Sequence, residues 1–150
     1  MSGIASNSNF GSYKTLIKTT MGLAEKRLAA SIKTEKLPAF EAKLKERAGY
    51  DIKVDIDWDT FTSYDEYPLS RLDIVFDDVE SFVKKICVDE MGKEALKDKI
   101  AAIHLTNSEN NDDVKMELKD ETLFLTVQLV QSSFNSQTDS QLAAYVEALL

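Results

Sequence analysis

The chain has 150 residues, of which 43% are hydrophobic and 29% are charged, with only five glycines and two prolines. This composition is typical of one globular domain with a sizeable core, and it argues against a linker-rich or disordered chain. The formal net charge of −8 argues against a direct nucleic-acid ligand, because phosphate binding depends on clustered Lys and Arg. An acidic surface instead favours solubility and attraction to a basic partner.

Cysteine and histidine each occur once, as Cys87 and His104. An internal disulfide is therefore excluded, and too few ligands are present for a structural zinc site. The N-terminal residues lack the apolar run of a signal peptide, and no segment has the ~18 consecutive apolar residues of a membrane span. We expect a cytoplasmic protein that does not bind membranes. A mature chain cut from a secreted precursor would have the same features, so that alternative stays open.

The N-terminal third of the chain is expected to be helical after a short tail. Residues 1–10 are rich in Ser, Asn and Gly and are expected to form a flexible tail ahead of a single domain over 11–150. Apolar residues at steps of three and four predict an amphipathic helix over 12–33. A second helix begins near Leu37 and is expected to stop at Gly49, a typical C-terminal helix cap.

The segment from Tyr50 to Pro68 fits two incompatible interpretations. Its first apolar residues alternate with charged ones, as in a half-buried strand with one acidic face: Ile52, Val54, Ile56 and Trp58. The same segment has the ligand spacing of a calcium-binding loop, with these carboxylates: Asp55, Asp57, Asp59 and Glu66. Such a loop needs glycine at its sharp turn, where this chain has the β-branched Thr60. We favour a strand over 50–58 and keep a calcium-binding 55–66 segment as the alternative.

The connection after this strand, Thr60 to Tyr67, is the candidate binding site. It carries Phe61 and then an acidic, tyrosine-rich run: Tyr64, Asp65, Glu66 and Tyr67. Tyrosine offers a large, rigid contact area with a polar tip, and the two carboxylates add negative charge. We therefore predict that this run binds a partner. The alternative is that two of the three aromatic side chains pack beneath the connection as a small core of their own.

A broad apolar stripe predicts a helix over 69–86 that packs on a sheet. Gly92 is expected to break this helix before a short helix or turn over 93–99. Cys87 follows the stripe and is expected to be buried and unreactive. A strand over 100–106 comes next, and it places His104 on the face opposite Ile103 and Leu105.

Two alternating runs, Val114–Leu118 and Leu123–Val130, predict an antiparallel hairpin. Thr138 or Asp139 can cap a final helix. The expected order of elements is α-α-β-α-β-β-β-α. It predicts an α+β fold with a mainly antiparallel sheet of about four strands and helices packed on one face.

No residue pattern indicates catalysis. His104 has no accompanying triad signature, and Met91-Gly92-Lys93-Glu94 lacks the upstream glycine and the Ser or Thr of a phosphate-binding loop. We therefore favour a non-catalytic, acidic protein that binds a basic macromolecule, expected to be another protein, as inhibitors and immunity-type proteins do. A module that binds a small ligand or calcium is the second interpretation, and an enzyme with a site assembled from scattered residues is the third. No cofactor is expected.

Overall fold

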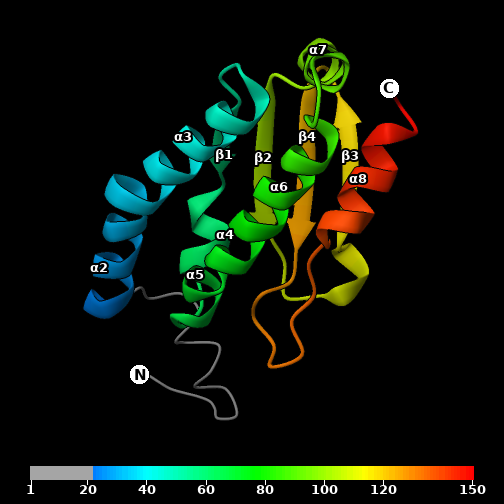
Figure 1. The fold of residues 1–150 in the computed structure, drawn as a ribbon. Coiled ribbons are helices and arrows are strands. Elements are labelled where there is room, and N and C mark those ends of the chain that lie inside the picture. Colours follow the sequence, from blue (N-terminus) through cyan, green and yellow to red (C-terminus); the bar gives the residue numbers. More distant parts are fainter. Residues whose placement is uncertain (1–21) are drawn as a thin grey trace, which may run out of the picture.

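The computed structural model describes residues 22–150, in which helices pack against one four-stranded sheet. The predicted tail over 1–10 and the first part of the predicted 12–33 helix lie outside these described residues. Helices α3, α6 and α8 lie side by side in front of the sheet (Figure 1). In the described part of the chain, no helix is both long enough and apolar enough to cross a membrane.

Strands form where they were predicted, but each strand end differs from the predicted one by one to three residues. The four strands are β1 (Lys53–Ile56), β2 (Ala102–Asn107), β3 (Lys115–Lys119) and β4 (Thr122–Val127). Their order in the sheet is β1-β2-β4-β3. Strands β1, β2 and β4 are parallel, and only the β3–β4 hairpin is antiparallel. The α+β class and the predicted hairpin are therefore confirmed.

The prediction of a mainly antiparallel sheet is partly wrong, because the sheet is mixed. Strand β1 connects to β2 through several helices, a crossover that returns the chain in the same direction. If consecutive strands paired, β3 would lie beside β2. In the structure β4 lies there instead, and β3 is at the edge. Burial explains this choice: Leu123, Leu125 and Val127 of β4 are completely buried, whereas β3 is only partly covered and suits an edge.

The first two predicted helices form one continuous helical rod. Helix α2 (Leu23–Ser31) passes into α3 (Leu37–Ala48) through a π-helical segment, Ile32–Lys36. The π segment ends two residues before Pro38, which has no N–H to donate to the preceding turn. Gly49 ends α3 with a left-handed φ of 83°, as predicted.

The predicted 69–86 helix is confirmed as α6 (Leu72–Ile86), whose apolar stripe is buried against the sheet. Gly92 does not break it. The break lies at 87–89, and Gly92 belongs to the first turn of α7 (Glu90–Lys99), where its N–H donates to the Asp89 side chain at 2.8 Å. Glycine is needed there because a Cβ would lie 1.9 Å from the Ile86 carbonyl oxygen.

The predicted 60–67 connection is not a plain loop. It lies between and within two short helices, α4 (Trp58–Thr62) and α5 (Tyr67–Ser70). The final helix is α8 (Asp139–Glu147), and Thr138 caps it by accepting a hydrogen bond from the Gln141 N–H at 3.2 Å. The predicted cap is therefore confirmed.

Candidate interaction surface at the carboxyl end of the sheet

The carboxyl ends of the three parallel strands meet at one edge of the sheet, the lower end in Figure 1. In open sheets with parallel strands, this edge is the usual place for binding sites. The connections that leave it are 57–71, 108–114 and 128–138, and we call the surface they form the carboxyl-end surface.

Two buried amide side chains hold these connections together. Asn107 donates through Nδ2 to the Thr60 carbonyl at 2.9 Å and accepts from the Leu129 N–H at 2.9 Å. Gln128 accepts from the N–H groups of Val130 and Gln131 at 2.8 and 2.7 Å. Its Nε2 donates to Asn111 Oδ1 at 2.8 Å. Because buried amides are costly unless hydrogen-bonded, this network fixes the conformation of all three connections.

The predicted binding run has a graded exposure. Phe61 is completely buried, Tyr64 is half-buried, and the side chains of Asp65, Glu66 and Tyr67 are exposed. Asp65 accepts a hydrogen bond from the Tyr67 N–H at 3.0 Å, a local turn that starts α5. The structure therefore places part of the aromatic set beneath the surface and leaves Tyr67, with an exposed fraction of 53%, available for contact.

Tyr67 belongs to an aromatic cluster that the sequence did not reveal. The Arg71 Cζ lies 5.0 Å from the centroid of the Tyr67 ring and 4.8 Å from that of Phe134. Arg71 also donates through Nη1 to the carbonyls of Leu129 and Gln131, at 2.9 and 2.6 Å. The guanidinium thus joins α5 to the 128–138 connection and holds two exposed rings at the surface.

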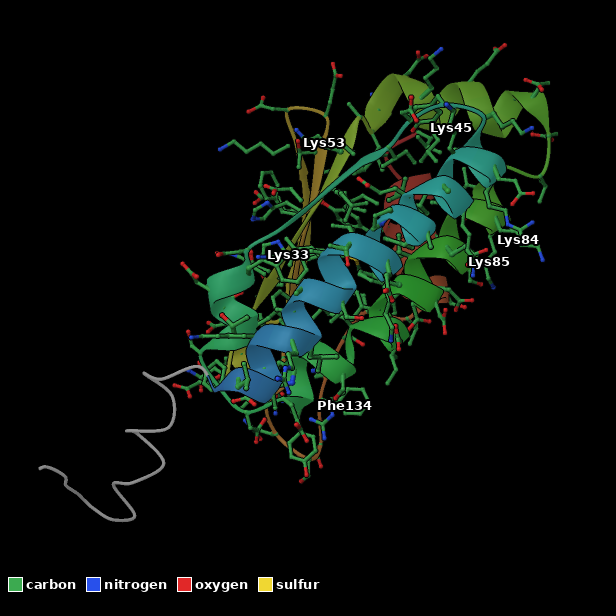
Figure 2. The ribbon with its side chains drawn as sticks, turned by 90° about the vertical axis from the view of Figure 1, so that its left-hand side faces the viewer. Lys33, Lys45, Lys53, Lys84, Lys85 and Phe134 are labelled. Atoms are coloured by element: carbon green, nitrogen blue, oxygen red, sulfur yellow. The ribbon has the colours of Figure 1, made fainter. Side chains whose placement is uncertain are left out.

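The carboxyl-end surface is strongly acidic. Its connections carry these carboxylates: Asp57, Asp59, Asp65, Glu66, Glu109, Asp112 and Asp113. Arg71 is the one cationic residue in the same three connections, while α2 brings Lys26 and Arg27 to the border of the surface. The Lys33 Nζ also lies at this border, 5.0 Å from the centroid of the Trp58 ring. Figure 2 shows Phe134 at this end of the molecule, and Lys45 and Lys53 toward the other.

The four carboxylates with calcium-loop spacing do not converge. Asp55 lies on β1 and pairs with His104 Nδ1 at 2.9 Å, whereas Asp59 lies within α4. Asp57 and Glu66 precede α4 and α5, respectively. Among residues 22–150, no group of three or more His, Cys, Asp or Glu side chains is placed to hold a metal ion.

Cys87 is buried as predicted, and burial raises the pKa of its thiol, an effect that the positive charge of Lys93 partly opposes. A buried, protonated thiol is a poor nucleophile. His104 contacts Phe124, with ring centroids 5.6 Å apart, on the sheet face away from the helices.

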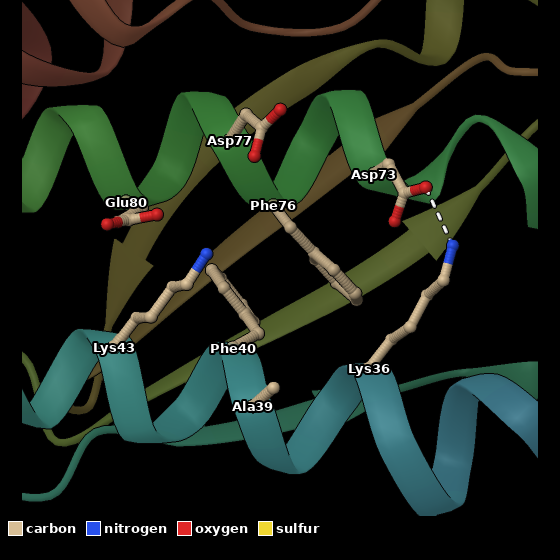
Figure 3. A pocket seen from close by; sticks show the side chains of 8 residues that line it. All are labelled: Lys36, Ala39, Phe40, Lys43, Asp73, Phe76, Asp77 and Glu80. Carbon is tan, nitrogen blue, oxygen red and sulfur yellow. Dashed lines mark hydrogen bonds and ion pairs between the residues drawn. The ribbon is translucent and has the colours of Figure 1, made fainter.

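A separate hollow of about 390 Å³ lies between α3 and α6 (Figure 3). Phe40 and Phe76 stack within it, with ring centroids 4.3 Å apart. Lys36, the last residue of the π-helical segment before α3, pairs with Asp73 of α6 at 2.8 Å. We interpret this groove as a helix–helix contact held by stacking and by opposite charges.

Comparison with known proteins gave no match to any family model, curated protein or solved structure.

Proposed function

We propose that the protein is a non-catalytic binding protein whose carboxyl-end surface contacts a basic macromolecule, and that this partner is another protein. One observation carries the proposal: the exposed rings of Tyr67 and Phe134 lie on a surface whose three connections carry seven carboxylates and one cationic residue. Interfaces concentrate binding energy in Tyr, Trp and Arg, and acidic neighbours attract a basic partner. An inhibitor or immunity-type protein that covers a basic site has this chemistry.

The site residues proposed from the sequence fit this surface in different roles. Tyr67 supplies contact area, and Asp65 and Glu66 supply negative charge beside it. Tyr64 lies between α4 and α5 in the sequence and is half-buried, so only the exposed part of its side chain can contribute to contact. Phe134 is the added member, and Arg71 fixes its position relative to Tyr67.

The rigidity of the surface supports the proposal. Hydrogen bonds from the Asn107 and Gln128 amides and from the Arg71 guanidinium hold its connections in place. A surface already in its binding conformation loses little conformational entropy when the partner binds. We also place the protein in the cytoplasm, which agrees with a single, buried, free cysteine.

The test is affinity capture from a lysate of the native host with the wild type and with single variants. Tyr67→Ala and Phe134→Ala should each weaken binding by about 2 kcal/mol or more, roughly thirtyfold in affinity. Met91→Ala is the matched control, because Met91 is 80% exposed but lies at the start of α7, far from this surface. Each variant is first checked for an unchanged melting temperature.

Charge is tested separately with Asp65→Asn and Glu66→Gln. These changes should slow association and reduce its salt dependence, because salt shortens the Debye length from about 10 Å at 0.1 M to about 3 Å at 1 M. Glu90→Gln and Glu94→Gln in α7 remove the same charges at the other end of the molecule and should have little effect. If all variants retain the same partners at both salt concentrations, the proposal is wrong.

A further inference from the structure

The sheet face opposite the helices is open within residues 22–150. Helices α3 and α6 lie on one side of the sheet (Figures 1 and 2), and the side chains that alternate away from them are exposed or half-buried. Strand register arranges these side chains in transverse rows. The cationic row consists of Lys53, Ala102, Thr122 and Lys119. The anionic row beside it consists of Asp55, His104, Phe124 and Glu117.

The two rows differ in size as well as in charge. The centre of the anionic row is bulky: Phe124 is 39% exposed, and its ring lies 5.6 Å from that of His104. The centre of the cationic row is small, with Ala102 and Thr122. A hollow of about 340 Å³ lies over these small residues and is bounded by the two bulky rings. The face therefore has a ridge and a hollow side by side.

We propose that two copies of this chain pack face to face through this open side of the sheet. A two-fold axis that runs parallel to the rows and between them places the cationic row of each copy over the anionic row of the other. Lys53 then faces Asp55 of the second copy, and Lys119 faces its Glu117. His104 and Phe124 enter the hollow over Ala102 and Thr122 of the second copy. An interface of this kind is self-complementary, as a two-fold dimer requires.

The charges in this arrangement are available for pairing. In the described part of the chain, Lys53, Lys119 and Glu117 form no ion pair, and all three side chains are exposed. Asp55 pairs with His104 and still exposes 65% of its side chain. Each copy thus offers two cations and two anions at matching positions, and the rotation brings unlike charges together at both ends of both rows.

The arrangement also agrees with sheet geometry and with the charge of the whole chain. Two sheets pack about 10 Å apart with strand directions within about 30° of each other, which the bulky row can fill. The same rotation places the two carboxyl-end surfaces at opposite ends of the dimer. The two acidic carboxyl-end surfaces therefore remain apart, and both stay accessible. The dimer is thus independent of whether the carboxyl-end surface binds a partner.

The test is the molecular mass in solution, by light scattering and sedimentation equilibrium over a range of protein concentrations at about 0.15 M salt. The wild type is expected to form dimers. Lys119→Glu should raise the dimer dissociation constant at least about tenfold, because it places like charges face to face twice in a two-fold interface. Lys119→Glu combined with Glu117→Lys restores unlike pairs and should return the constant to near the wild-type value.

Lys84→Glu is the matched control, because it makes the same charge change at an exposed position on α6, away from the sheet face. A wild type that stays monomeric at all concentrations overturns the proposal. A dimer that is insensitive to Lys119→Glu, or equally weakened by Lys84→Glu, uses another surface and overturns it as well. A Lys119→Glu, Glu117→Lys protein that fails to regain dimerisation also overturns the predicted register.

Discussion

Arg71 and Phe134 pack against each other across a large separation in sequence, with the guanidinium Cζ 4.8 Å from the centroid of the ring. The same guanidinium donates hydrogen bonds to the carbonyls of Leu129 and Gln131. Its flat, delocalised charge can stack on a ring and donate in its own plane at the same time. Arg71 therefore fixes the position of the proposed contact residues without needing to touch a partner itself.

Arg71→Lys should lower the free energy of unfolding by about 1–3 kcal/mol, because lysine cannot both stack on the rings and donate to two carbonyls. The measurement is urea unfolding at neutral pH. Arg47→Lys is the matched control, since Arg47 pairs with Glu80 at 3.4 Å on a partly exposed helix surface, where such pairs contribute little. Equal losses for both variants would contradict the role given to Arg71.

Asn107→Ala should be more destabilising, by about 2–4 kcal/mol, because it removes both a donor and an acceptor from a buried network. It leaves the Leu129 N–H and the Thr60 carbonyl without their side-chain partner. Asn110→Ala, at an exposed position in the neighbouring connection, should change stability by less than about 0.5 kcal/mol. The comparison is made by urea unfolding, and similar values for the two variants would mean that the network is not important for stability.

The spacing of apolar residues predicted those helices and strands whose buried face is visible within their own sequence. The α6 stripe and the alternation of β2, β3 and β4 each identify a buried face without reference to the rest of the chain. Strand order depends on distant pairing, and no local pattern shows that β4 inserts between β2 and β3. The alternation also led to a wrong end for the first strand. Trp58 continues the alternation of Ile56 in the sequence, but in the structure it is the first residue of α4.

The candidate site was predicted only in its contiguous part. Tyr64 to Tyr67 stood out because aromatic and acidic residues are neighbours in the sequence. Phe134 lies alone in a polar segment, and its contact with Arg71 exists only in the folded chain. Asn107 could have been noticed, because it continues the buried alternation of Ile103 and Leu105, where a polar residue needs a partner.

Calcium at millimolar concentration is expected to leave the melting temperature unchanged. The carboxylates with loop spacing are divided between β1, α4 and the start of α5, so they do not surround one point. A site occupied at 100 times its dissociation constant would add about 2.7 kcal/mol to the free energy of unfolding, which calorimetry detects easily. A rise in melting temperature that Asp57→Asn abolishes would instead restore the calcium-binding interpretation.

The stability of the protein should fall in alkaline solution partly because of Tyr50. Burial raises the pKa of its phenol well above the usual value, and the negative charge that the nearby Cys87 carries once its thiol loses its proton adds to the effect. The phenol donates a hydrogen bond to the Ile100 carbonyl at 2.7 Å, which only the protonated form can do. The folded state therefore holds this proton at pH values where the unfolded chain releases it.

Because the folded state keeps this proton longer than the unfolded chain, the free energy of unfolding should decrease as the pH rises. Below its unfolded-state pKa of about 10, Tyr50 makes its full contribution to the free energy of unfolding. Above that pH, this contribution should fall by up to about 1.4 kcal/mol per pH unit. Tyr50→Phe should be about 1 kcal/mol less stable at neutral pH because it lacks the hydrogen bond, but its stability should decline less steeply above pH 10. Urea unfolding from pH 8 to 11 measures both effects, with Tyr67→Phe, at an exposed position, as the control. If Tyr50→Phe and the wild type decline in parallel, the Tyr50 phenol is not held protonated by the fold.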